Sequence, residues 1–334
     1  MTVKVCSTQT QLPLSLEIVP DKTEVQYPVS QMRWSYSRRV VLEQCPRRYY
    51  YEYYGAAALA ASGHPNEAVV RLLKSLQNRH ERAGTIAHLV ISTYFRRAQS
   101  GEVWAADRLC RWARDIFRND WTYSQANPAA MSRPTGKFPP VLLHEYYYRN
   151  PDASALCLEA QERLVNAVNT FATSPRFAEF RLAGSRSGSL VEDRLTLQGL
   201  PCHVDGRLDL AFNAAGRGVV VDWKLGNPSG GGDDSLQLAA YALWASHHFA
   251  AAPEAVTVYK AYLTADEIVQ FPVSESILAN SRARIIQDAE RMAVLHDYGQ
   301  RGIVEAFTPC AQLGVCKLCP FQKVCPEGRA VLHA

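Results

Sequence analysis

The chain has 334 residues, of which 47% are hydrophobic and 20% charged, and this composition excludes a disordered or fibrous protein. A formal net charge of +4 at pH 7 is too small to indicate nucleic-acid binding by bulk charge alone. The longest stretch of low charge, residues 55–63, is far shorter than the ~20 apolar residues of a membrane-spanning helix. The N-terminus shows no apolar stretch after a basic start, so we expect no secretory signal and predict a cytoplasmic protein.

The first half of the chain is predicted to be mostly helical. Residues 1–30 have no sustained periodicity and are expected to form an irregular or strand-bearing extension. After them, apolar residues at helical spacing predict a helix that begins at Ser35 or Ser37 and ends at Gly55. Further helices are predicted over residues 65–98, 101–125 and about 154–181.

The pattern then changes to strands. Alternating or continuous apolar runs of strand length are found at 189–200, 203–212, 218–225, 256–263 and 267–273. Helices are predicted at 235–249, between the third and fourth strands, and at 274–297. The fold class is therefore α/β, with a mixed central sheet of about five strands flanked by helices. The predicted parts are an extension, a helical portion, an α/β core and a Cys-rich tail, over 1–30, 31–185, 186–300 and 301–334.

Two charged residues stand two positions apart on the third predicted strand. Asp222 and Lys224 project from the same face because strand side chains alternate, while Trp223 packs behind them. Asp209 would lie beside them if its strand paired antiparallel with this one. Such paired carboxylates can hold Mg²⁺ or Mn²⁺, and a neighbouring lysine can orient or deprotonate water, which suits phosphodiester hydrolysis. The alternative is a solvated strand face, but an unpaired charge in an apolar strand would be costly to bury.

Three other polar residues are candidates for the same site. Gln237 and Tyr241 are four residues apart and so share one face of their predicted helix, where they could hold a phosphate or Lys224. His88 lies on an otherwise apolar helix. By itself, His88 would more commonly be a buried histidine whose hydrogen bonds are satisfied.

The C-terminal cysteines have the spacing of metal ligands. Cys316 and Cys319 form a C-x-x-C pair, and Cys325 supplies a third thiolate. Cys310 could complete a local zinc site as the fourth ligand. The remaining thiols are expected to pack as small apolar residues at Cys6, Cys110, Cys157 and Cys202.

Taken together, GTIAH, GRLD, VVVDWKL and QLAAY resemble, in this order, the motifs of the PD-(D/E)XK nuclease superfamily. The resemblance is to the RecB-like branch, with its CRISPR-associated exonucleases and AddB-type nuclease domains. It implies a restriction-endonuclease-like core and a metal-dependent nuclease. The implied ligands of Mg²⁺ or Mn²⁺ are His88, Asp209 and Asp222. Lys224 would position the attacking water, with support from Gln237 and Tyr241.

The same resemblance implies an iron–sulfur clasp. Cys45, in EQCPRRYYY, resembles the N-terminal ligand of RecB-like nucleases that carry a [4Fe-4S] cluster. Its partners would be Cys316, Cys319 and Cys325. This assignment is favoured over Zn²⁺ bound with Cys310, and it would join the two ends of the chain around the core.

A basic, aromatic segment is the candidate DNA contact. Cations interleaved with Trp34 and several tyrosines suit single-stranded DNA, because cations meet phosphates and aromatic rings stack on bases. The candidate residues are Arg33, Arg38, Arg39, Arg47 and Arg48. The alternative is that many of these side chains simply pack the helix against the cluster portion.

The expected activity is exonuclease cleavage of single-stranded DNA in repair, recombination, CRISPR adaptation or antiviral defence, beside a helicase or defence protein. The chain carries no G-x-x-x-x-G-K-[ST] motif, so it is not expected to be a helicase itself. The alternatives are a structure-specific endonuclease and a non-catalytic DNA-binding subunit. A further alternative is a protein that binds partners and contains a zinc knuckle.

Overall fold

The computed structural model describes residues 27–334 except 133, 137–138 and 230–232. Cys6 and most of the predicted extension lie outside these residues. The chain divides into two compact units. The first contains the described residues up to Val70 together with 199–204 and 284–334, and the second contains 71–198 and 205–283. The predicted boundaries of the four parts remain a prediction.

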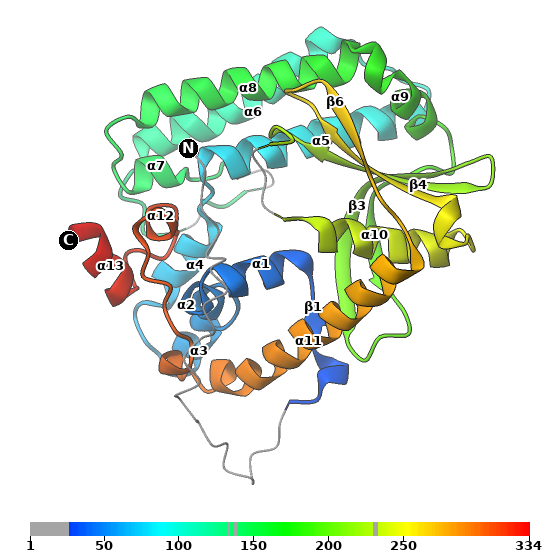
Figure 1. The fold of residues 1–334 in the computed structure, drawn as a ribbon. Coiled ribbons are helices and arrows are strands. Elements are labelled where there is room, and N and C mark those ends of the chain that lie inside the picture. Colours follow the sequence, from blue (N-terminus) through cyan, green and yellow to red (C-terminus); the bar gives the residue numbers. More distant parts are fainter. Residues whose placement is uncertain (1–26, 133, 137–138, 230–232) are drawn as a thin grey trace. The chain divides into compact units, whose positions relative to one another are not determined.

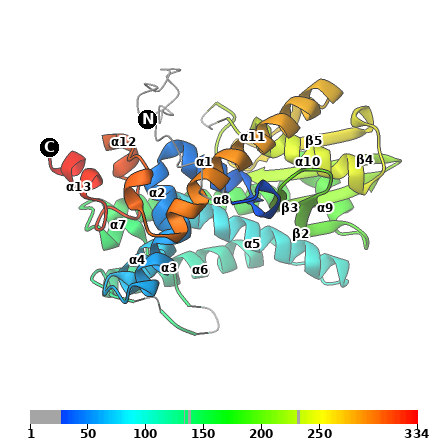
Figure 2. The same cartoon turned by 90° about the horizontal axis from the view of Figure 1, so that it is seen from below.

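The second unit is built around a mixed sheet, as predicted. Its strands are β2 (Leu190–Leu197), β3 (His203–Ala214), β4 (Arg217–Lys224), β5 (Val256–Tyr262) and β6 (Glu267–Phe271). The order is β3-β4-β5-β6, and β2 also pairs with β3. β3 and β4 are antiparallel, so the condition for bringing Asp209 beside Asp222 is met. β4 and β5 are parallel and are joined through helix α10 (Ser235–His248), which lies against both strands (Figures 1 and 2).

Three long helices of this unit pack against one another (Figure 1). These are α5 (Arg79–Gln99), α6 (Ala106–Ala126) and α8 (Ala153–Thr173). The unit also contains the shorter helices α7 (His144–Tyr147) and α9 (Ala178–Gly184) and 3₁₀ turns at Pro175–Phe177 and Pro253–Ala255. α5, α6 and α8 share one hydrophobic core with Val219, Val221 and Trp223 of β4. The rings of Phe95 and Phe171 lie 6.3 and 5.4 Å from that of Trp223. Trp223 therefore packs behind the charged face of β4, as predicted.

Helix α5 begins at a capping box. The backbone N–H groups of His80 and Glu81 donate to Asn78 Oδ1 at 2.9 and 3.0 Å, and the Asn78 N–H donates to Glu81 Oε2 at 3.0 Å. Reciprocal capping of this kind satisfies backbone donors that a helix start otherwise leaves unpaired. It fixes the start of the helix that carries His88.

Three of the predicted helices are interrupted in the structure. Residues 65–98 form two helices, α4 (Glu67–Ser75) and α5, and the helix predicted over about 154–181 is divided into α8 and α9 at Ser174. The third lies in the first unit. The helix predicted up to Gly55 is interrupted at Cys45, whose backbone is extended between α1 (Tyr36–Gln44) and α2 (Pro46–Tyr50). The single-helix prediction was therefore wrong, because a residue before proline is disfavoured in the helical region. The start was right, since the Ser35 side chain caps α1 by accepting from the Arg38 N–H.

The remaining elements of the first unit are short, and an aromatic cluster lies among its residues. They are the turn Val29–Gln31, β1 (Arg33–Trp34), the π-helix Tyr51–Gly55, α3 (Ala56–Ala61), the turn Val304–Ala306, α12 (Leu313–Cys316) and α13 (Pro326–His333). Two more helices run from one unit into the other, α4 (Glu67–Ser75) and α11 (Glu275–Gln300). Tyr49 and Tyr54 are buried in the cluster together with Phe307. No helix among the described residues is both long and apolar enough to span a membrane.

Candidate active site

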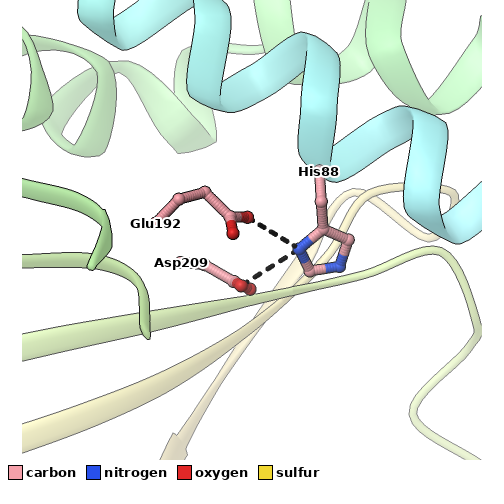
Figure 3. Close-up of side chains that lie close together, drawn as sticks. All are labelled: His88, Glu192 and Asp209. Carbon is pink, nitrogen blue, oxygen red and sulfur yellow. Dashed lines mark hydrogen bonds and ion pairs between the residues drawn. The ribbon is translucent and has the colours of Figure 1, made fainter. Parts of the chain in front are cut away.

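A histidine and two carboxylates converge in the second unit (Figure 3). His88 Nδ1 on α5 lies 3.0 Å from Asp209 Oδ1 on β3 and 3.6 Å from Glu192 Oε1 on β2. One donor atom from each residue lies within 4.8 Å of the other two. Ligands of an octahedral Mg²⁺ are about 3.0 to 4.2 Å apart, and carboxylate oxygens are the ligands that Mg²⁺ and Mn²⁺ prefer, so the two carboxylates of this set fit either ion.

Glu192 was not among the residues predicted for the site. Its φ of 50° is in the left-handed region, which a glutamate adopts only at a cost. Its other oxygen, Oε2, faces the guanidinium of Arg207 at 3.6 Å. No motif in the sequence singles out Glu192, because its place depends on the pairing of β2 with β3 and on this unusual backbone conformation.

Asp209 connects the carboxylate cluster to β4. Its Oδ2 accepts the backbone N–H of Trp223 at 2.8 Å, while Oδ1 faces His88. The antiparallel register pairs Leu210 with Val221, so the next pair outward would be Asp209 and Asp222. Both carboxylates are buried, at 7% and 2% exposed respectively. Two buried carboxylates on adjacent strands repel each other unless a cation lies nearby.

A chain of polar contacts runs from Asp222 to α10. Lys224 Nζ lies 2.7 Å from Asp222 Oδ2 and donates to Gln237 Oε1 at 3.3 Å. Gln237 Nε2 donates to the Tyr241 hydroxyl at 2.8 Å, and that hydroxyl donates to the Arg207 carbonyl at 3.1 Å. The structure thus brings Gln237 and Tyr241 to Lys224, as their shared helix face suggests.

The charges of these groups depend on one another. Burial raises the pKa of Asp222 to about 6, and Asp209 adds to this rise while Lys224 opposes it. Burial opposes the charged form of His88, but the Asp209 and Glu192 carboxylates raise its pKa well above its ordinary value. Burial likewise opposes the charge of Lys224, whose pKa is nevertheless raised by Asp222. The carboxylates thus favour cationic partners, which in this structure include the His88 imidazolium and the Lys224 ammonium.

Asp234 and Lys260 lie next to this chain of polar contacts, and the sequence analysis did not predict either of them for the site. Asp234 Oδ1 lies 2.8 Å from Lys260 Nζ on β5, and Asp234 Oδ2 lies 3.7 Å from Lys224 Nζ. A signal was present, because Lys260 lies in a predicted strand and Asp234 directly precedes a predicted helix. Neither residue belongs to a motif, and their meeting depends on how the segment before α10 lies against β5.

In the first unit, four cysteines line one pocket. They are Cys45, Cys316, Cys319 and Cys325. The Cys45 sulfur accepts the backbone N–H groups of Cys310 at 3.3 Å and Arg48 at 3.5 Å. Among the described residues, no three cysteine sulfurs lie within 4.8 Å of one another.

The candidate DNA-binding arginines differ in their surroundings. Arg47 is buried, donates to the Phe307 carbonyl at 2.8 Å and forms an ion pair with Glu327 at 3.1 Å. Its guanidinium is therefore used within the fold, which argues against the prediction that it contacts DNA. Arg39 is paired with Glu43 and Asp288. Arg33 is exposed, whereas Arg38 and Arg48 are half-buried.

A comparison with curated proteins found no match to this chain. A sequence profile of the PD-(D/E)XK nuclease superfamily matches residues 33–326, which is most of the chain. The match includes β3, β4 and α10, the elements that carry the convergent carboxylates, Lys224 and Gln237. The profile, the mixed sheet flanked by helices and the site on its strands agree, and the chain belongs to the PD-(D/E)XK nuclease superfamily.

Proposed function

We propose that this protein is a metal-dependent deoxyribonuclease that degrades single-stranded DNA from free ends. The observation that carries the proposal is the convergence of His88, Glu192 and Asp209 within 4.8 Å. The Asp222–Lys224 pair lies on the strand adjacent to Asp209. Oxygen-rich ligands for a divalent cation and a neighbouring lysine are the groups that phosphodiester hydrolysis requires.

The metal-ligand roles of His88, Asp209 and Asp222 are those that the resemblance implies, whereas the roles of Glu192, Gln237 and Tyr241 follow from their contacts. His88, Asp209 and Asp222 would hold Mg²⁺ or Mn²⁺, with Glu192 as a further ligand. The bound ion would supply Lewis-acid activation of the scissile phosphate and of water. Lys224 orients the attacking water through an ammonium N–H. Gln237 fixes the ammonium by accepting at 3.3 Å, and Tyr241 fixes Gln237 in turn.

Single-stranded DNA is proposed as the substrate because of the resemblance to RecB-like exonucleases and the interleaved cations and aromatic rings near Arg33. Arg33, the exposed arginine of this segment, is the one most available to a phosphate. Stacking on bases combined with phosphate contacts is the usual means of binding single strands. We propose a role in DNA repair or antiviral defence, with a helicase or defence protein as partner.

We also propose a [4Fe-4S] cluster on Cys45, Cys316, Cys319 and Cys325. Two findings support it over a zinc site with Cys310. The first is that these four thiols line one pocket, whose lining residues do not include Cys310. The second is that Cys310 offers its backbone N–H to the Cys45 sulfur, a contact that tunes sulfur ligands in clusters.

The test is cleavage of 5′-labelled single-stranded and double-stranded DNA by anaerobically purified protein in Mn²⁺, Mg²⁺, Ca²⁺ or EDTA. We expect shortening of the single strand with Mn²⁺ or Mg²⁺ and none in EDTA. Cleavage that persists in EDTA would contradict the proposal. Tight DNA binding without cleavage under any condition would favour the non-catalytic binding subunit.

A further inference from the structure

Two carboxylate–lysine pairs lie side by side on the parallel strands β4 and β5. The register places Lys260 directly opposite Asp222, so these side chains emerge from the same face. Asp234, which precedes α10, faces both lysines with its two oxygens. The four charges thus form a continuous row from Asp222 through Lys224 and Asp234 to Lys260.

The spacing along this row is uneven. Asp222 is 2.7 Å from Lys224 and Asp234 is 2.8 Å from Lys260, but the central separation, from Asp234 Oδ2 to Lys224 Nζ, is 3.7 Å. A charge-assisted hydrogen bond to an ammonium is about 2.7 to 2.9 Å long. Asp234 therefore stands about 1 Å short of a hydrogen bond with Lys224.

This gap matters because an ammonium has only three N–H donors. Lys224 donates one N–H to Gln237, and its ion pair with Asp222 occupies at most one more. A further N–H is left for a water or a phosphate oxygen only while Asp234 keeps its distance. If Asp234 moved closer, all three donors would be taken by the protein.

Lys260 is the cation nearest to Asp234. Its ammonium lies 2.8 Å from Asp234 Oδ1 and 5.7 Å from the ring centre of Tyr262, two residues along β5. The Lys260 side chain is 19% exposed and that of Asp234 is 17% exposed, so solvent competes weakly with this pair. Without Lys260, Lys224 would be the nearest cation to the Asp234 carboxylate.

We propose that Lys260 is a positioning residue that holds Asp234 away from Lys224 and so keeps one N–H of Lys224 available to the reaction. The inference rests on the proposed nuclease function and deepens it. The simpler reading is an ion pair that merely links α10 to β5. The two readings differ in what they predict when both charges are removed.

The kinetic test compares Lys260→Met, Asp234→Asn and the double variant by single-turnover cleavage of labelled single-stranded DNA. Lys260→Met is expected to lower the maximal rate about tenfold with little change in the DNA concentration for half-maximal rate. Adding Asp234→Asn should return the rate to within about threefold of wild type, because the competing carboxylate charge is gone. The control is Arg217→Met, which removes an exposed cation at the far end of β4.

Full activity of Lys260→Met would overturn the proposal. So would a double variant as slow as Lys260→Met, because a purely structural ion pair is not rescued by removing its second partner. Melting temperatures of all variants identify any loss of folding. Failure of the wild-type protein to cleave would count against the nuclease function instead.

A second readout does not depend on activity. In a crystal structure of Lys260→Met, an Asp234 oxygen is expected about 2.8 Å from Lys224 Nζ. An Asp234 carboxylate that remains at its wild-type separation would overturn the proposal, whether or not the protein cleaves DNA.

Discussion

At the scale of single residues, the carboxylates of the site also support the fold. Asp209 accepts a backbone N–H of β4 with one oxygen and faces His88 with the other. Glu192 faces the same histidine from a left-handed backbone conformation. Strain of this kind costs of order 1–3 kcal/mol and persists where the surroundings enforce it, which is typical of functional sites.

Replacing Glu192 by Gln should weaken binding of Mn²⁺ about 10- to 100-fold, because a charged ligand is lost while the shape is kept. The measurement is calorimetric titration of the purified protein with Mn²⁺. Asp193→Asn, at the exposed neighbouring position of β2, is the matched control and should bind normally. Equal affinity in all three proteins would remove Glu192 from the proposed ligands.

Replacing Tyr241 by Phe should lower the free energy of unfolding by about 1–2 kcal/mol and slow DNA cleavage. The buried hydroxyl joins Gln237 to the Arg207 carbonyl, and its loss leaves both with one partner fewer. Denaturant unfolding and a cleavage assay measure the two effects. Tyr259→Phe, which changes a half-buried tyrosine on β5, should alter neither the free energy of unfolding nor the cleavage rate. A Tyr241→Phe protein of wild-type stability and rate would show that the hydroxyl is dispensable.

At the scale of elements, close packing around α5 holds His88 in place. Gly184, at the end of α9, is buried, and a Cβ there would lie 2.4 Å from the ring of Phe95 and 3.0 Å from Leu210. A side chain at this position would therefore push apart α9, α5 and β3. Leu210 is the neighbour of Asp209, so this packing bears directly on the site.

Gly184→Ala should destabilise the protein by about 1–3 kcal/mol, because overpacking forces ring and backbone shifts. Gly84→Ala, within α5 itself, is the control, since nothing lies within 4 Å of its Cβ position. The free energy of unfolding of this control should rise by up to about 1 kcal/mol, because alanine has a better helix propensity than glycine. Melting temperatures measure both, and a Gly184→Ala variant as stable as wild type would contradict the packing account.

The elements also show how far the sequence could be interpreted. Strand alternation predicted β2 to β6, and it placed Asp222 and Lys224 on one face with Trp223 behind. Local pattern does not reveal which strands pair or in what register, and so Glu192 was missed. It also does not reveal how the segment before α10 lies against β5, and so the meeting of Asp234 with Lys260 was missed. The interruption at Cys45 was missed although Pro46 signals it, because the apolar spacing continues across the break.

At the scale of the whole molecule, the proposed cluster would join residues about 270 positions apart in the chain. Metal binding that exists only in the folded state contributes directly to folding, and closure of so long a loop removes conformational entropy from the unfolded chain. The described cysteines of the pocket come from the α1–α2 break and from the C-terminal segment.

The proposed [4Fe-4S] cluster should give the wild-type protein bound iron and a brown colour. Replacing Cys45 by Ser should abolish both, and it should make the protein more sensitive to limited proteolysis. Cys310→Ser should keep both iron and stability. Iron and zinc analysis of anaerobically purified proteins, with visible spectra, measures this. Cys110→Ser, a half-buried thiol outside the pocket, is the control. The proposed cluster would be contradicted if the wild-type protein contained zinc in place of iron, and if Cys310→Ser lost this zinc while Cys45→Ser kept it.

The most direct test of the central claim is single-turnover cleavage of end-labelled single-stranded DNA with Mn²⁺ by wild type, Asp209→Asn and the control Asp193→Asn. A covalently closed single-stranded circle is included to separate exonuclease from endonuclease action. The account predicts Mn²⁺-dependent shortening of the linear strand, an intact circle, and a rate reduced about 10³-fold or more in Asp209→Asn alone. A folded Asp209→Asn protein that cleaves as fast as wild type would show that the chemistry takes place elsewhere and contradict the account.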